Sequence, residues 1–402
     1  MTMNQNAKLE IGESIVAATL TGADEIEILA GACARLNAAG LSLVRASIAH
    51  DLLDPSYDAR AVRWLRVSGG VEEPFARLEP DAINENWLRS PFAALLDSGE
   101  PILRRRLDAR YRRGEFSLLD RFQDEGATDY IAFVSRFGGS LRLGESEGVV
   151  ASWTTDTPTG FTDAQIALLE GLMPLLTLVF VLRTTNRNAR TLIRTYLGAD
   201  AAERVLAGNI VRGRAVPIRA VVWFSDLVGF TRMADTMDAA AVLELLNDYA
   251  ETQVEAIEAH GGNVLKFVGD GILAIFPHED TALACRSALD AVATHRGRVA
   301  ELNARRIADG LPVTDTHIAL HVGELLYGNL GSPRRLDFTV LGVAVNEASR
   351  IEALCASLEQ NVIVSSAFAD AAGDARHRLV GLGRYAMKGV ARPQELFTLD
   401  SP

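Results

Sequence analysis

Cysteine is scarce in this chain of 402 residues, and its placement excludes two classes of protein. The three cysteines, Cys33, Cys285 and Cys355, lie far apart in the sequence. They match neither a zinc-binding spacing nor a disulfide framework. A zinc-stabilised fold and a disulfide-rich secreted domain are therefore not expected, and we predict a reducing, cytoplasmic location.

The chain also lacks an excess of positive charge and a long apolar run. Its formal net charge is −12, so nucleic acid is not an expected partner. The N-terminus has neither the basic start nor the apolar stretch of a signal peptide. One apolar segment, residues 172–182, is 11 residues long, whereas a membrane-spanning helix needs about 20. We predict a buried core helix there and no transmembrane span.

Lysine is the third scarce residue, because only three of the 40 basic residues are lysines: Lys8, Lys266 and Lys388. None of them follows a glycine, which excludes a Walker-type phosphate loop. Lysine offers a compact charge on a flexible stem, and arginine offers a rigid fork. A retained lysine can therefore mark a position where a guanidinium does not substitute, although chance explains a single one equally well.

The length and composition of the chain predict two globular domains with a connector. Hydrophobic residues make up 48% and charged residues 23%, which is the balance of a folded chain. The first domain shows two helical patterns and four strand patterns, at 22–39, 162–182, 41–50, 60–67, 130–137 and 148–154. This order resembles a GAF-type sensor domain. The resemblance implies that residues 1–182 regulate the rest of the chain and receive an unidentified small-molecule or protein signal.

The connector, residues 183–219, is rich in arginine, and we assign its first part, residues 183–213, as a helical linker. Eight arginines against Asp200 and Glu203 give the connector a net charge of +6. A short apolar face is supplied by Leu192, Ile193, Tyr196 and Leu197. A solvated stalk that packs on its own dimer mate explains this composition, and a signal-transmitting helix or a membrane-surface patch is the alternative.

The pattern changes near residue 218, after which two aspartates follow buried strands. The apolar strand 218–224 leads to Asp226, and the apolar runs 263–268 and 272–276 flank Asp270 as in a β-hairpin. Two such carboxylates suit a hard cation such as Mg²⁺. Each aspartate taken alone is better explained as a helix cap or a turn residue, because aspartate is common in both places.

Five motifs in this half decide between these interpretations. In chain order they lie at 224–231 (FSDLVGFT), 266–276 (KFVGDGILAIF), 321–332 (HVGELLYGNLGS), 337–354 (DFTVLGVAVNEASRIEAL) and 387–399 (MKGVARPQELFTL). Together they resemble the catalytic domain of class III adenylate and guanylate cyclases, over residues 214–402. The resemblance implies an α/β (α+β) fold with a central, mainly antiparallel sheet. It also implies a homodimer that binds ATP at sites built between two head-to-tail domains.

The same resemblance implies that the two aspartates bind metal. Asp226 and Asp270, with the carbonyl oxygen of Leu227, match the ligands of two Mg²⁺ ions, for which Mn²⁺ can substitute. The ions would serve an in-line displacement at the α-phosphorus, with pyrophosphate as the leaving group. The turn after the first aspartate would present backbone N–H groups to the phosphates. This turn contains Gly229, Phe230 and Thr231.

Four further positions match residues that contact the nucleotide in the family. Lys266 matches the lysine that donates to adenine N1, and it favours ATP because guanine N1 is itself a donor. Asn346 and Arg350 lie four residues apart on a predicted helix and so share one face. They match the residues that orient the ribose and stabilise negative charge on the α-phosphate. Lys388 matches the lysine that contacts the triphosphate.

Two positions depart from the common adenylate cyclase pattern. Thr339 stands seven residues before Asn346, where many members have an aspartate that accepts from the adenine amino group. Its hydroxyl can accept the same bond, and threonine here is typical of a subgroup that often responds to bicarbonate. Bicarbonate activation is therefore a hypothesis for this chain. Val343 removes a carboxylate near the site.

The leading hypothesis is a homodimeric, Mg²⁺-dependent adenylate cyclase controlled by its N-terminal domain. A guanylate cyclase is the first alternative, and Lys266 disfavours it. A non-catalytic nucleotide-binding signalling module is the second, and the intact set of two aspartates, asparagine and arginine disfavours that. An N-terminal domain that only dimerises, without a ligand, is compatible with the same sequence.

Overall fold

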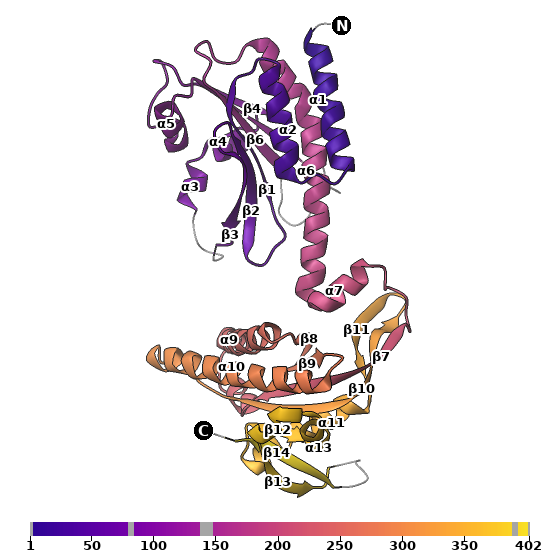
Figure 1. Ribbon diagram of the computed structural model, residues 1–402. Helices are drawn as coiled ribbons and strands as arrows, with labels where there is room; N and C mark the ends of the chain where they lie inside the picture. Colours follow the sequence, from indigo (N-terminus) through magenta and orange to yellow (C-terminus); the bar gives the residue numbers. More distant parts are fainter. Residues whose placement is uncertain (1–2, 79–83, 137–147, 388–392, 401–402) are drawn as a thin grey trace. The chain divides into compact units, whose positions relative to one another are not determined.

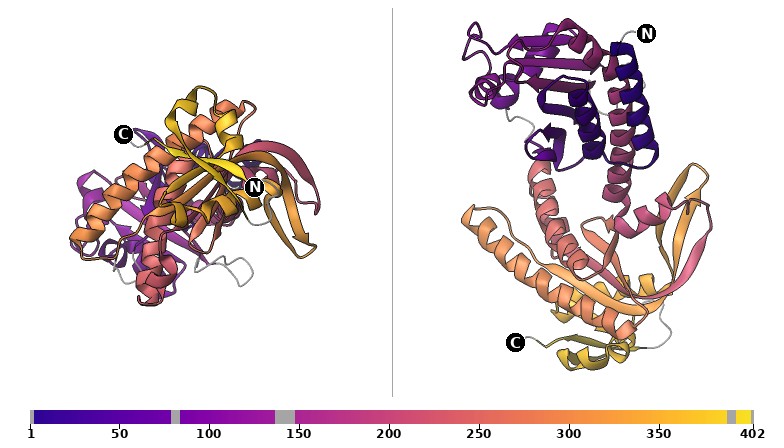
Figure 2. Two further views of the ribbon diagram at one scale, coloured as in Figure 1. Left: turned by 90° about the horizontal axis from the view of Figure 1, so that it is seen from below. Right: turned by 45° about the horizontal axis from the view of Figure 1, so that its top comes forward.

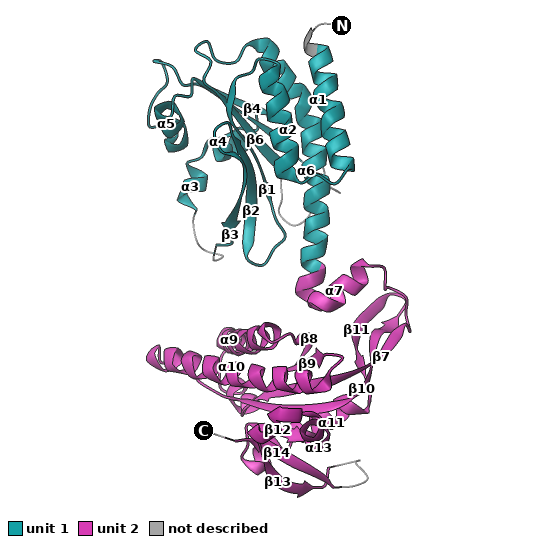
Figure 3. Cartoon of the chain, in the orientation of Figure 1, with its two compact units in different colours: residues 1–192 teal, residues 193–402 magenta. Residues whose placement is uncertain are grey.

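The computed structural model divides the chain into two compact units, residues 1–192 and residues 193–402 (Figure 3). The described residues are 3–78, 84–136, 148–387 and 393–400. The division falls inside the segment that the sequence suggests as a linker. Each unit has its own sheet and its own apolar core.

The N-terminal unit is built on a six-stranded sheet in which every neighbouring pair is antiparallel (Figure 1). The strand order is β3-β2-β1-β6-β5-β4. The bounds are β1 (Leu43–Asp51), β2 (Tyr57–Leu65), β3 (Gly69–Ala76), β4 (Ile102–Arg106), β5 (Asp129–Arg136) and β6 (Gly148–Thr155). The four strands predicted from alternation, β1, β2, β5 and β6, are confirmed; β3 and β4 were not predicted.

Long helices cover one face of this sheet and short helices lie over the other (Figure 1). The long ones are α1 (Met3–Leu20), α2 (Glu25–Ala38) and α6 (Asp163–Leu197), and the short ones are α3 (Glu85–Leu88), α4 (Pro91–Ser98) and α5 (Ser117–Asp124). The first face holds the larger core, which includes Leu29, Trp153 and Leu172. The second face holds a separate apolar cluster around Phe122 and Tyr130.

Helix α6 contains the apolar segment predicted to be a buried core helix. Leu172, Met173 and Leu176 are each no more than 4% exposed and belong to the larger core, whereas Leu178 and Leu182 are exposed, so the prediction of a buried core helix is confirmed for one face only. By length and composition alone, α6 is also the one helix of the described residues that could cross a membrane. The helix does not end near residue 182 as predicted but continues to Leu197, because neither glycine nor proline occurs between residue 182 and Gly198, where φ is 77°.

The C-terminal unit is built on a second sheet with the strand order β13-β14-β12-β10-β7-β9-β8, and β11 pairs with the far end of β10. Only the β10–β12 pair is parallel, so the predicted mainly antiparallel sheet is confirmed. The bounds are β7 (Ala215–Leu227), β8 (Asn263–Val268), β9 (Gly271–Pro277), β10 (Thr316–Ser332), β11 (Arg335–Leu341), β12 (Val362–Ser365), β13 (Leu379–Tyr385) and β14 (Gln394–Leu399).

Helices cover both faces of this sheet. They are α7 (Ala199–Leu206), α8 (Phe230–Ala234), α9 (Ala239–Ala259), α10 (Thr281–Ala308), α11 (Val343–Glu352), α12 (Cys355–Leu358) and α13 (Ser366–Ala371), with a 3-10 turn η2 (Gly373–Arg378). Helices α9 and α10 pack against each other (Figure 2) and, with α13, cover the face that carries Trp223. Helices α7 and α11 cover the opposite face, which carries Val222 and Tyr327.

The second half of the expected linker packs into the C-terminal unit. Ala201 and Ala202 of α7 are no more than 2% exposed. The Tyr327 hydroxyl donates to Asp200 at 2.7 Å, and the Arg204 guanidinium lies 5.1 Å from the centre of the Tyr327 ring. These contacts attach α7 to strand β10, close to where β11 joins it.

Candidate functional site

The β8–β9 hairpin brings Asp270 to the end of strand β7. Strands β7 and β9 are antiparallel, with Ser225 opposite Ile272. Gly271 makes this approach possible, because a Cβ at that position would overlap the Ser225 carbonyl oxygen. The backbone N–H of Leu227 donates to a carboxylate oxygen of Asp270 at 3.2 Å. Residues 226, 227 and 270, predicted to act together, therefore lie side by side.

The two aspartates form an uncompensated acidic pair. Partial burial, together with hydrogen bonding and repulsion from Asp270, raises the pKa of Asp226 to about 7. Glu352 at the end of α11 adds to this repulsion, and burial together with Asp270 raises its own pKa. Neither aspartate forms an ion pair with a basic side chain among the residues that the structure describes. The pair is thus an excess of negative charge, with Asp226 on β7 and Asp270 in the turn between β8 and β9.

This donor set fits a divalent cation with a preference for oxygen. Two carboxylates and a neighbouring backbone carbonyl are the ligands that Mg²⁺ and Mn²⁺ favour, and a cation would neutralise the repulsion between them. No cluster of three or more His, Cys, Asp or Glu side chains with metal-binding geometry occurs in the described part of the chain. A cation here would therefore need further ligands from water or from a bound substrate.

The predicted phosphate turn follows directly after β7. Gly229 has φ 68°, a left-handed conformation that suits glycine, and it precedes the short helix α8. Val228 donates its N–H to the Asp315 carbonyl at 2.9 Å, which fixes the start of the turn. The N–H groups in the first turn of a helix have no intrahelical acceptor, so those of Phe230 and Thr231 are available to an outside acceptor.

Lys266 and Thr339 lie on strands that approach each other. Lys266, on β8, places its ammonium nitrogen 3.3 Å from a carboxylate oxygen of Asp337 on β11. Thr339 follows two residues later on the same strand, is 2% exposed, and has no hydrogen-bond partner for its hydroxyl among the described residues. Asp337 was not predicted as a site residue, although its place two positions before Thr339 puts both on one strand face.

Asn346 and Arg350 lie on the face of α11 that points away from the sheet. Ala344 and Ala348 on the opposite face are buried, whereas Asn346 is exposed and Arg350 is half-buried. At 100° per residue, Asn346 and Arg350 project about 120° and 160° away from Glu352 around the helix axis. Since Glu352 faces the acidic pair, the structure does not bring these two residues together with Asp226 and Asp270 of the same chain.

The remaining two positions identified from the sequence are Lys388 and Val343. Lys388 lies outside the described residues. Val343 is the first residue of α11 and is 69% exposed, so it forms no part of the core. Sequence reasoning also missed Glu352, whose only signal is its position at the end of the Asn346–Arg350 helix.

The C-terminal unit is similar to a family of catalytic domains. Residues 218–401 match the family model described as the adenylate and guanylate cyclase catalytic domain. The adenylate cyclase of Anabaena cylindrica is 33% identical over 157 residues, which cover 39% of this chain and 31% of that protein. Adenylate cyclase 1 of Rhizobium meliloti (strain 1021) is 23% identical over an alignment that covers 98% of this chain and 64% of that protein. The matched part thus spans between about a third and two thirds of these relatives.

Solved structures also align with part of this chain. The adenylyl cyclase CyaB from P. aeruginosa aligns with 25% identity and a TM-score of 0.43, covering 47% of this chain and 97% of that one. The guanylyl cyclase Cya2 aligns with 28% identity and a TM-score of 0.41, covering 47% of this chain and 96% of that one.

Proposed function

We propose that this chain is a homodimeric adenylate cyclase that converts ATP to 3′,5′-cyclic AMP and pyrophosphate, because residues 218–401 match the adenylate and guanylate cyclase catalytic domain. ATP is proposed as the substrate because the ammonium group of Lys266 lies beside the strand that holds Thr339. Relatives named adenylate cyclase support the same choice.

Adenine is recognised by one donor and one acceptor in this proposal. The Lys266 ammonium donates to adenine N1, and the Thr339 hydroxyl accepts from the adenine amino group. Guanine has the opposite hydrogen-bonding pattern, with a donor at N1 and an acceptor at the carbonyl oxygen. The unpartnered Thr339 hydroxyl supports this role, because a buried hydroxyl without a partner is costly unless a ligand satisfies it.

Asp226, Asp270 and the carbonyl oxygen of Leu227 hold two divalent ions in this proposal, Mg²⁺ with Mn²⁺ able to substitute. When bound, these ions would polarise the α-phosphate and acidify the ribose 3′-hydroxyl. The chain's own contribution is a rigid carboxylate pair, fixed by the Leu227–Asp270 hydrogen bond. The turn containing Gly229, Phe230 and Thr231 adds N–H donors to the phosphates.

Asn346 and Arg350 act on a nucleotide held by a second chain. Asn346 orients the ribose, and Arg350 stabilises the negative charge that develops on the α-phosphate. Their position on the outward face of α11, away from the acidic pair of their own chain, supports a site completed by a partner subunit. Lys388 would contact the triphosphate, as the family motif implies.

Turnover of ATP and GTP by the purified full-length chain tests this proposal. With Mg²⁺ present, we expect cyclic AMP from ATP and a much lower yield of cyclic GMP from GTP. A clear preference for GTP would identify the chain as a guanylate cyclase. Absence of both products, with nucleotide still bound, would make it a non-catalytic signalling module.

Control by the N-terminal unit is part of the proposal. Its resemblance to a GAF-type sensor and the uninterrupted helix α6 that leaves it support this role. The activity of full-length protein should then differ from that of a chain beginning near residue 185. Equal activities at equal dimer concentration would leave the N-terminal unit as a dimerisation domain.

A further inference from the structure

Both backbone polar groups of Val228 are held by the loop that precedes β10. The Val228 N–H donates to the Asp315 carbonyl at 2.9 Å, and the Val228 carbonyl accepts from the Thr314 hydroxyl at 2.7 Å. The contact of that hydroxyl with the Asp315 carbonyl is longer, at 3.4 Å. Val228 joins Leu227 to the predicted phosphate turn, residues 229–231. The loop therefore fixes the chain between the expected metal-binding carbonyl and the expected phosphate-binding N–H groups.

A closed ring of three hydrogen bonds holds Thr314 itself. The Thr314 N–H donates to the Tyr249 hydroxyl oxygen at 2.8 Å, this hydroxyl donates to the side-chain carbonyl of Asn303, and the Asn303 amide donates to the Thr314 carbonyl at 2.9 Å. Tyr249 lies on α9 and is 0% exposed, and Asn303 lies on α10. Since the N–H and the carbonyl of Thr314 are both bonded, two packed helices set the position of its hydroxyl.

Asp315 is fixed from the other side of the loop. One of its carboxylate oxygens accepts from the Thr316 N–H at 2.7 Å, and the other accepts from the side-chain amide of Asn361, just before β12. Thr316 is opposite Leu227 in the pairing of β10 with β7. Thr314 and Asp315 thus continue the contact between these two strands past the end of β7.

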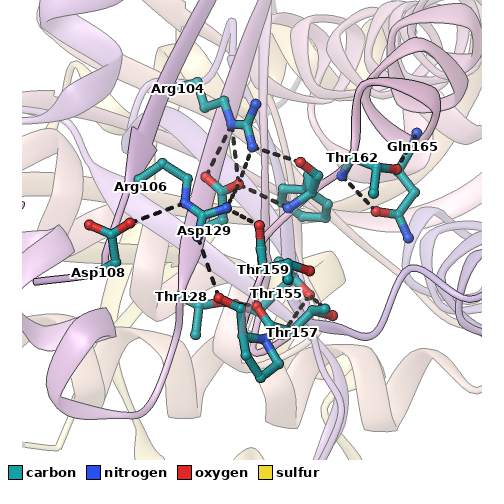
Figure 4. Close-up of polar contacts among 12 residues, drawn as sticks. Arg104, Arg106, Asp108, Thr128, Asp129, Thr155, Thr157, Thr159, Thr162 and Gln165 are labelled. Carbon is teal, nitrogen blue, oxygen red and sulfur yellow. Dashed lines mark hydrogen bonds and ion pairs between the residues drawn. The ribbon is translucent and has the colours of Figure 1, made fainter. Parts of the chain in front are cut away.

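The N-terminal unit fixes one of its turns in the same manner (Figure 4). The Thr128 hydroxyl donates to the carbonyls of Thr155 and Thr157 at 3.1 and 2.6 Å, at the start of the segment that leads from β6 to α6. Thr128 and Thr314 are both half-buried, and each uses its hydroxyl to hold a backbone carbonyl. Thr128 belongs to the other unit, so it provides a matched control for Thr314.

We propose that Thr314 is a positioning residue, which acts through Val228. It holds the Leu227 carbonyl and the N–H groups of residues 229–231 in place for a triphosphate with its Mg²⁺. The inference rests on the proposed function and adds to it a residue that lies in none of the sequence motifs. A turn that is already fixed loses less conformational entropy when the triphosphate binds. The Thr314 hydroxyl contacts neither nucleotide nor metal in this proposal, so its removal weakens binding without removing a ligand.

Binding of inorganic triphosphate in the presence of Mg²⁺ tests the inference on full-length protein. We would titrate it calorimetrically into the natural protein, T314V and T314S. T314V keeps the shape of the side chain and removes the hydroxyl, so its dissociation constant should rise about 3- to 10-fold, as expected for one neutral hydrogen bond. T314S keeps the hydroxyl and should bind like the natural protein. If T314V does not fold, T314A and T314S form the pair that differs in the hydroxyl alone.

Kinetics and a control separate positioning from general stability. T314V should raise the KM for ATP by the same factor and leave kcat nearly unchanged, because the phosphates are held in the ground state and in the transition state alike. T128V should lose melting temperature as T314V does but keep the natural affinity for triphosphate.

Three results would overturn the inference. They are an unchanged affinity in T314V, an equal loss of affinity in T314S or T128V, and no binding of triphosphate by a natural protein that makes cyclic AMP. A natural protein that binds triphosphate but forms no cyclic nucleotide would instead contradict the proposed function. The calorimetric comparison of T314V with T314S would still decide the role of Thr314.

Discussion

Lys266 gives the sharpest residue-scale test of base recognition. K266M should lower kcat/KM for ATP about 10- to 100-fold, because a hydrogen bond from a charged donor contributes about 1.5–3 kcal/mol. The loss should be smaller for GTP, whose N1 does not accept. Cyclic nucleotide yield over a range of ATP and GTP concentrations measures both effects.

Lys8 provides the control for that substitution. It lies in the N-terminal unit on α1 and is exposed, so K8M removes the same charge far from the base-recognition strands. K8M should keep the ATP kinetics of the natural protein. Equal losses for ATP and GTP in K266M would instead assign Lys266 to general electrostatic attraction of nucleotides.

Two buried histidines predict the dependence of stability on pH. Burial lowers the pKa of His50 and of His295 from 6.5 to about 4, one in each unit. Each folded value lies below the unfolded one, so each histidine contributes stability above pH 6.5 that is lost as the pH falls towards 4. The loss between pH 7 and pH 5 should be about 2 kcal/mol for each histidine.

Glutamine substitutions isolate these contributions. H50Q and H295Q should each reduce the difference in melting temperature between pH 7 and pH 5, and the double variant should reduce it most. Calorimetry at the two pH values provides the measurement. A pH difference unchanged in both single variants would show that other groups control acid stability.

At the residue scale, the sequence motifs predicted which residues belong to the site. They did not predict all of the contacts that those residues make. Asp226 and Asp270 lie together, as their strand-end positions suggested. The partner of Lys266 and the approach of Glu352 to the acidic pair were not predicted. Both depend on contacts between segments some 70 to 130 residues apart, and distance in space cannot be read from local pattern.

At the scale of elements, helix α6 combines a buried face with an exposed apolar stripe. Leu178 and Leu182, one turn apart, are 64% and 61% exposed. Both leucines lie just before residues 183–213, the helical linker that the sequence predicts to pack on its dimer mate, and we expect that contact to extend to them. L178D should therefore weaken dimerisation about tenfold or more, since burying a charge in an apolar contact is costly. Sedimentation over a concentration series would measure it.

V67D is the control for L178D, because it adds the same charge elsewhere on the N-terminal unit. Val67 is 95% exposed in the turn before β3, so V67D adds the same carboxylate without touching α6. V67D should dimerise like the natural protein. Unchanged dimerisation of L178D would mean that this face of α6 is not the contact between copies.

Element boundaries show where sequence patterns mislead. The change from apolar to arginine-rich sequence at residue 183 suggested the end of a helix, but polarity alone does not stop a helix, and no glycine or proline occurs from residue 183 to residue 197. The predicted start at Gly22 was three residues early, because the Asp24–Glu27 capping box begins α2 at Glu25. Helix α10 was not predicted at all, since alanine and arginine dilute its apolar pattern.

At the scale of the whole molecule, mixing of defective chains tests a shared site. D270A lacks the metal-binding half and R350A lacks the charge-stabilising half, so each homodimer should lose activity about 100-fold or more. Equal mixing makes half of the dimers mixed, each with one intact site, and should restore about a quarter of the natural activity. Differently tagged chains would confirm that mixed dimers form; if they form without recovery, each site is complete within one chain.

The position of Arg350 on the outward face of α11 predicts how defective chains behave in a cell that also makes the natural chain. In the proposed dimer, each site takes its metal-binding aspartates from one subunit and Arg350 from the other. A chain with both D270A and R350A would therefore inactivate both sites of a dimer formed with the natural chain. Expressed beside the natural chain, such a double variant would act as a dominant inhibitor. The two single defects would instead complement each other, because a dimer of one D270A chain and one R350A chain keeps one intact site. A cell carrying both single variants on separate gene copies would therefore keep part of its activity.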